Sequence, residues 1–139
     1  MGDVLPLRLK PFLDPDNRAF WTGGAGGDLM VHRCDDCGWW THPPRPRCRR
    51  CLSTRVRPRR TAGRGRVATF TVNHQPWIPG SDLYIVALVE LVEQAGLFLT
   101  TNLVDVDGSE VELGMEVEVV FEEAGDGIHL PLFRPVGRR

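Results

Sequence analysis

The chain has 139 residues, of which 42% are hydrophobic and 25% are charged, and its formal net charge is −1. This length allows one domain, or two very small ones, with a moderate hydrophobic core. No stretch approaches the roughly 18 consecutive apolar residues of a membrane span. The N-terminal sequence matches neither a secretory signal nor a myristoylation motif, which predicts a cytoplasmic protein whose thiols stay reduced.

The charge is divided unevenly along the chain. Residues 33–66 hold eleven arginines and only two acids, whereas residues 67–133 hold twelve acids and no lysine or arginine. Binding to nucleic acid depends on cationic side chains that displace counterions, so the acidic half would repel a polyanion. The charge pattern therefore disfavours nucleic acid as a partner.

Residues 1–30 are predicted to form an N-terminal helical arm. A short helix is expected at residues 18–21, with Asp14 or Asp16 as its cap. The glycine-rich run at 23–27 is expected to end that helix and to act as a flexible linker. This run follows no strand and contains no G-x-G-x-x-G motif, so a phosphate-binding loop is disfavoured.

All four cysteines lie in the next segment, 31–60, which is predicted to be a zinc ribbon. A two-residue gap lets both sulfurs of one turn face a common centre, and two such turns make a tetrahedral site. This pattern favours structural zinc, with iron in a rubredoxin-like site as the alternative. Protein ligands would fill every position, leaving none open for catalysis. Gly38, directly after the first pair, permits the left-handed turn that such sites use. The predicted ligands are Cys34, Cys37, Cys48 and Cys51.

The aromatic and basic residues around the cysteines form a second candidate site. Exposed tryptophans anchor interfaces, and guanidinium groups bind phosphate through paired hydrogen bonds, so these residues could contact a partner protein or a phosphate group. The tryptophans could instead pack ribbon, helix and barrel together, and the arginines could pair with the acidic half. The candidate residues are Trp39, Trp40, Arg45, Arg47, Arg49 and Arg50.

The histidines are not arranged in a pattern that is typical of a catalytic site. His32 and His42 flank the cysteines and are expected to be surface or ribbon-packing residues, with additional metal ligands or hydrogen-bond donors to the ligands as the alternative. His74 and His129 have no nucleophile at a recognisable turn motif, and all the cysteines are assigned to the metal. The sequence therefore predicts no catalytic residues.

Residues 61–139 are predicted to form a small β-barrel. Five segments are rich in β-branched or aromatic residues or alternate between apolar and polar positions, and turn residues separate them. Five short strands in about 70 residues are typical of the OB barrel. The predicted strands span residues 66–73, 83–92, 97–104, 116–123 and 128–133.

The order of these segments resembles that of one known family. The chain has Phe-Trp in the predicted helix, a C-x-x-C-G…P-P-R-P-x-C-x-x-C ribbon, G-x-G-x-V…T-F-T-V, G-M-x-V-x-V-x-F and P-L-F-R-P. It is similar to the acyl-CoA-associated zinc-ribbon/OB-fold family, known as domain of unknown function thirty-five. The matching residues are 20–21, 34–51, 63–72, 114–121 and 131–135.

The resemblance implies a mainly β fold with an N-terminal helical arm, a rubredoxin-like zinc ribbon and a C-terminal five-stranded OB-fold barrel. It also implies a non-catalytic accessory subunit or domain of a hetero-oligomer. Such a subunit binds and stabilises a thiolase-like enzyme of the lipid-transfer type and helps to form its acyl-CoA channel. In steroid degradation, a similar pair is an aldolase that cleaves a shortened side chain from a steroid acyl-CoA. The alternatives are a stand-alone acyl-CoA-binding protein and a single-stranded nucleic-acid-binding module.

Overall fold

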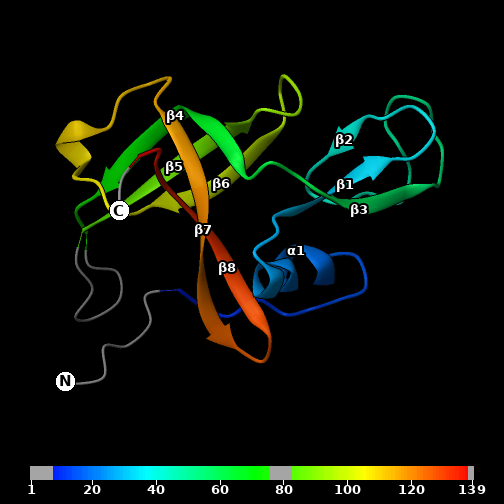
Figure 1. The fold of residues 1–139 in the computed structure, drawn as a ribbon, viewed down its shortest axis with the longest axis horizontal. Helices are drawn as coiled ribbons and strands as arrows, with labels where there is room; N and C mark the ends of the chain where they lie inside the picture. Colours follow the sequence, from blue (N-terminus) through cyan, green and yellow to red (C-terminus); the bar gives the residue numbers. More distant parts are fainter. Residues whose placement is uncertain (1–7, 76–82, 138–139) are drawn as a thin grey trace.

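The structure is a computed structural model that describes residues 8–75 and 83–137. The chain is mainly β, with N-terminal helical turns, a three-stranded ribbon and a closed five-stranded barrel, which confirms the predicted fold class (Figure 1). In chain order the elements are α1 (Arg18–Thr22), η1 (Gly23–Gly26), β1 (Met30–Cys34), β2 (Trp40–Thr41), β3 (Val56–Arg60), β4 (Arg64–Asn73), β5 (Tyr84–Leu91), β6 (Phe98–Leu103), η2 (Gly108–Glu110), β7 (Glu116–Gly125) and β8 (Ile128–Pro135).

The predicted short helix is present, but its cap differs from the prediction. The residue before α1 is Asn17, not Asp14 or Asp16. The Asp14 carboxylate instead accepts hydrogen bonds from the main-chain N–H groups of Asp16 and Asn17, at 2.8 and 2.7 Å, and so forms the turn that leads into the helix. Within the two described ranges, no helix combines the length and hydropathy needed to cross a membrane.

The glycine run is an ordered 3₁₀ turn and not the flexible linker that the sequence predicts. The turn η1 packs against β8. A Cβ atom added to Gly24 would lie 2.4 Å from the Phe121 ring and 2.6 Å from the His129 Cβ atom. The main chain at Gly24 therefore approaches the barrel too closely for any side chain, which is the physical reason for glycine at this position.

The barrel contains all five predicted strands, in the order β4-β5-β6-β8-β7 with β4 and β7 closing it. In β5 the alternate residues Ile85, Ala87, Val89 and Leu91 are buried. The pairing of β5 with β6 is continuous from Phe98 to Leu103, whereas β6 and β8 are paired at a single position. The barrel is thus weakly closed along one seam.

Ribbon, helix and barrel share one hydrophobic core. Phe20 of α1 and Val31 of β1 belong to the same buried cluster as the barrel residues Val67 and Phe133. Helix α1 contacts both β1 and β8, and in Figure 1 it lies beneath the connection between ribbon and barrel. Burial of apolar surface therefore holds the three parts together.

The turn between β5 and β6 fastens the ribbon to the barrel. The side-chain amide of Gln94 accepts a hydrogen bond from the Trp40 main-chain N–H at 2.9 Å and donates one to the Trp40 carbonyl at 3.0 Å. The neighbouring Glu93 carboxylate accepts a hydrogen bond from the Ala62 N–H at 2.6 Å. Two consecutive side chains of the barrel therefore hold β2 and the connection that follows β3.

Candidate functional site

The four cysteine sulfurs meet at one end of the ribbon. All four Sγ atoms lie within 4.8 Å of one another, with Cys34 and Cys51 at 3.6 Å and Cys37 and Cys48 at 3.5 Å. Tetrahedral Zn–S bonds of about 2.3 Å place the sulfurs about 3.8 Å apart. The four cysteines are therefore positioned to hold a metal ion, as the sequence predicts.

The two cysteine pairs are folded alike. The Gly38 N–H donates to the Cys34 carbonyl at 2.9 Å, and the Leu52 N–H donates to the Cys48 carbonyl at 2.8 Å. Both donors have a positive φ, +81° for Gly38 and +65° for Leu52. The sequence signals the first turn through its glycine. It gives no signal for the second, because leucine rarely adopts this conformation.

Main-chain groups prepare the sulfur of Cys48 for a metal. The N–H groups of Cys51 and Arg50 point at this sulfur, at 3.5 and 3.3 Å, and lower the pKa of the Cys48 thiol to about 7. The Cys48 side chain is completely buried. A metal needs the thiolate form, so these donors favour the ligating state.

The histidines of the ribbon lie outside the sulfur cluster, as predicted. The His42 ring packs against the Phe20 ring with centroids 4.8 Å apart, and burial lowers the pKa of His42. His32 is buried as well, and burial likewise lowers its pKa. Both residues thus favour the neutral imidazole and serve as packing groups.

The two ribbon tryptophans have different surroundings. Trp40 packs against the shared core and is held by Gln94, which agrees with the packing interpretation. Trp39 is half-buried, and the Arg50 guanidinium lies 5.2 Å from the centre of its ring. The fourth tryptophan of the chain, Trp77, lies outside the described residues. Trp39 is therefore the better candidate for a contact with a partner.

The arginines of the ribbon fall into two groups. Arg55 pairs with Asp36 at 3.1 Å, and Arg59 pairs with Asp35 at 2.8 Å, so the acids between the first two cysteines neutralise arginines at the end of the ribbon and on β3. The second group, around Pro46, is exposed and makes no ion pair among the described residues. It consists of Arg45, Arg47, Arg49 and Arg50.

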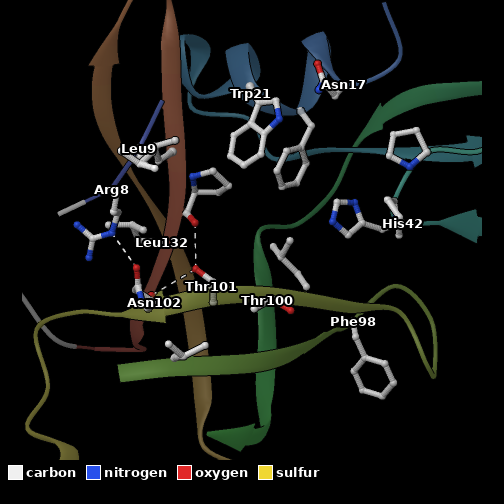
Figure 2. A pocket seen from close by; sticks show the side chains of 17 residues that line it. Arg8, Leu9, Asn17, Trp21, His42, Phe98, Thr100, Thr101, Asn102 and Leu132 are labelled. Atoms are coloured by element: carbon white, nitrogen blue, oxygen red, sulfur yellow. Dashed lines mark hydrogen bonds between the residues drawn. The ribbon is translucent and has the colours of Figure 1, made fainter. Parts of the chain in front are cut away.

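A groove with a volume of about 690 Å³ lies where helix, ribbon and barrel meet. Its walls are largely apolar, with Phe20 and Trp21 from α1, His42 from the ribbon, and Phe98 and Leu132 from the barrel. In Figure 2, Trp21 and His42 lie across the groove from strand β6. The sequence did not predict this groove, because its walls come from segments far apart in the chain.

The polar groups beside the groove are largely bonded to one another. Arg8 donates to the Asn102 side chain at 2.8 Å and forms an ion pair with Glu122 at 3.0 Å. The Thr101 hydroxyl donates to the Pro131 carbonyl at 3.0 Å (Figure 2). Arg8 is the only lining residue that is always charged among those described, and Glu122 neutralises it. The groove therefore suits an uncharged, mainly apolar occupant.

The remaining polar candidates are bound in structural interactions or exposed. Glu118 pairs with Arg64 and Arg134, and Glu110 completes a capping box with Asp107. His74 is exposed on the surface. None of these residues lines the groove.

The fold and the cysteine site define a protein that joins a metal-binding ribbon to an OB-like barrel. Residues 21–57 match the ChsH2 rubredoxin-like zinc ribbon domain, and residues 59–122 match the ChsH2 C-terminal OB-fold domain. The "DUF35 domain-containing scaffold protein" of Methanothermobacter thermautotrophicus is 36% identical over 110 residues, which cover 73% of this chain and 80% of that protein. The chain belongs to the DUF35 family.

Longer relatives carry a similar segment. A "Probable enoyl-CoA hydratase alpha subunit" of Thermomonospora curvata is 40% identical over 93% of this chain and 40% of its own length. The "3-oxo-4,17-pregnadiene-20-carboxyl-CoA hydratase alpha subunit" of Mycobacterium tuberculosis is 32% identical over 85% of this chain and 37% of its own length. This chain thus spans about two fifths of the hydratase subunits that it matches.

Two solved structures have the same fold. A chain of the "Ltp2-ChsH2(DUF35) aldolase" has a TM-score of 0.77 and 39% identity, and the match covers 91% of this chain and 98% of that one. A DUF35 protein of unknown function from Sulfolobus solfataricus has a TM-score of 0.60 and 15% identity, with 87% and 85% covered, and supports the fold alone.

Proposed function

We propose that the chain is a non-catalytic accessory subunit or domain that binds and stabilises a thiolase-like acyl-CoA enzyme. We further propose that this enzyme is a steroid side-chain retro-aldolase. The observation that carries the proposal is the 39% identity, over 98% of its length, to a chain of the Ltp2-ChsH2(DUF35) aldolase. The partner would supply the acid–base residues, since no such set was recognised in the sequence.

The longer relatives support an acyl-CoA substrate. Both hydratase alpha subunits are named for CoA thioesters, and one of these thioesters has a pregnadiene skeleton. The segment that they share with this chain is proposed to serve assembly and substrate passage.

The groove supports a role in the acyl-CoA channel. Its apolar walls and neutralised Arg8 suit an apolar group, either of the acyl-CoA or of the partner that completes the channel, better than the charged nucleotide. The exposed arginines around Pro46 lie on the ribbon and suit an anionic group. We propose that Arg45, Arg47, Arg49 and Arg50, with Trp39 and Trp40 beside them, contact the partner or a CoA phosphate.

The metal in this proposal is structural zinc. Four cysteine ligands would complete its coordination, so it would stabilise the ribbon and leave no position for substrate. The ribbon in turn carries His42 and the exposed arginines. Zinc would thus contribute to the function indirectly, by stabilising the ribbon that carries these residues.

Affinity purification of the tagged chain from its native host tests the proposal. We expect a thiolase-like chain to co-purify in a fixed ratio, and aldolase activity toward a steroid acyl-CoA to require both chains. The matched variant pair is Arg49→Ala on the ribbon and Arg66→Ala on the barrel, both exposed. We expect only Arg49→Ala to weaken assembly or CoA binding. Recovery of the chain alone, or measurable salt-sensitive binding of single-stranded DNA, would contradict the proposal.

A further inference from the structure

Strand β6 has an open edge at the groove. Its pairing with β5 runs without a shift from Phe98 to Leu103, so main-chain groups alternate regularly between the two sides of the strand. The Leu97 carbonyl bonds to β5 at 2.9 Å, and the Val104 N–H bonds to the Phe133 carbonyl of β8 at 2.8 Å. By this alternation, Phe98 and Thr100 direct their N–H and C=O groups away from β5.

Strand β8 does not pair with these groups. The two strands are partners only at Leu103 and Phe133 and diverge beyond that position. Two residues before Phe133, Pro131 has no N–H to donate, and its carbonyl already accepts the Thr101 hydroxyl. In the part of the chain that the structure describes, the register of β6 with β8 includes no partner for Phe98 or Thr100.

The open edge faces the groove rather than bulk surface. Both Phe98 and Thr100 line the groove, and Phe98 is 39% exposed. Trp21 and His42 stand opposite (Figure 2), and burial keeps the pKa of His42 low, so its ring adds no charge at neutral pH. An unpaired strand edge beside exposed aromatic surface is a template for another strand.

We propose that this edge of β6 takes one extended peptide segment of the partner subunit. The segment pairs main chain to main chain with Phe98 and Thr100 and places an apolar side chain against the row of rings formed by Trp21, Phe20 and His42. The identity of the partner rests on the proposed function. The binding mode is strand addition, in which main-chain hydrogen bonds supply affinity and alternate side chains supply specificity.

The chemistry of the edge favours a peptide over an acyl chain. Phe98 and Thr100 are two residues apart, so their hydrogen-bonding groups repeat at about 7 Å, which is the repeat of a second strand. A hydrocarbon chain would leave these donors and acceptors without partners. Arg8 is the one lining residue with a permanent charge in the described ranges, and Glu122 neutralises it, so the segment should be uncharged.

A proline substitution removes one of the proposed hydrogen bonds. Thr100→Pro deletes the N–H on the open edge, and the β5 ladder survives because that N–H does not face β5. Thr100→Ala keeps the N–H and removes only the hydroxyl. We expect the dissociation constant for the partner to rise about tenfold with Thr100→Pro and to stay within about twofold with Thr100→Ala. Equal affinities of the proline variant and the unaltered chain would overturn the inference.

Amide hydrogen exchange tests the same edge in the unaltered chain, so the result does not depend on whether a variant folds. On adding the partner subunit, we expect at least tenfold slower exchange at Phe98 and Thr100. Leu99 and Thr101, whose amides face β5, are the internal controls. A complex that forms without this protection would refute strand addition and leave the proposed function standing. If the two subunits form no complex, both strand addition and the proposed function are contradicted. Protection by CoA alone would assign the edge to the ligand and overturn the inference.

Discussion

Replacing Gln94 by methionine tests whether one side chain fastens the ribbon to the barrel. The amide of Gln94 makes two hydrogen bonds to the Trp40 main chain, at 2.9 and 3.0 Å, in a partly buried position. A neutral hydrogen bond contributes about 0.5–1.5 kcal/mol. Methionine keeps the length of the side chain but leaves the Trp40 N–H and C=O unpaired, so we expect the free energy of unfolding to fall by about 1–3 kcal/mol.

Equilibrium urea unfolding of the zinc-loaded protein, followed by circular dichroism, measures this loss. Gln75→Met is the matched control, because Gln75 is exposed. We also expect the Trp40 amide to exchange faster with solvent in Gln94→Met. If Gln94→Met and Gln75→Met differ by less than about 0.5 kcal/mol, the reasoning that two hydrogen bonds join ribbon to barrel is refuted.

Three other substitutions test the metal site, the close packing and the buried imidazole. Cys48→Ser should abolish stoichiometric zinc binding and ribbon order, as measured by metal analysis and amide exchange, and retention of both would contradict a Cys₄ site. Gly24→Val should lower the melting temperature, because its side chain would collide with Phe121, whereas Gly26→Val in the same turn, whose Cβ would lie no closer than 3.8 Å to another group, should cost less. Burial lowers the pKa of His42 in the folded chain, so the unfolded chain binds a proton at this histidine at a higher pH than the folded chain does. The free energy of unfolding should therefore fall as the pH drops below about 6.5. His42→Gln should flatten this dependence in urea titrations with zinc content checked at each pH. If the free energy of unfolding depends on pH equally in His42→Gln and the unaltered chain, His42 is not the source of this dependence.

The features predicted correctly from sequence are those that local spacing determines. Two residues between paired cysteines are sufficient to bring sulfurs together, and the structure places all four Sγ atoms within 4.8 Å. Strands β5 and β7 were recognisable because apolar residues run or alternate along them and turn residues bound them. Both signals depend on neighbours in the chain, so they need no knowledge of the tertiary fold.

The features that sequence missed depend on contacts between distant segments. The glycine run looks like a linker until β7 and β8 supply the Phe121 and His129 side chains that exclude a Cβ atom at Gly24. The pairing of Arg59 with Asp35 depends on the register of β1 with β3 and on a turn that a sequence pattern does not determine. The groove is the extreme case, because no single segment contains enough of its wall to be recognised.

The position of the groove has a consequence for how the chain can be divided. His42 stands on the ribbon side of the boundary between the two matched modules, and Thr100 and Leu132 belong to the barrel. Cutting the chain near residue 58 would give two fragments, each with half a groove and an exposed part of the shared core. Exchange of ribbons between related proteins would likewise recombine mismatched walls. The two modules therefore have to be transplanted, evolved and expressed as one unit.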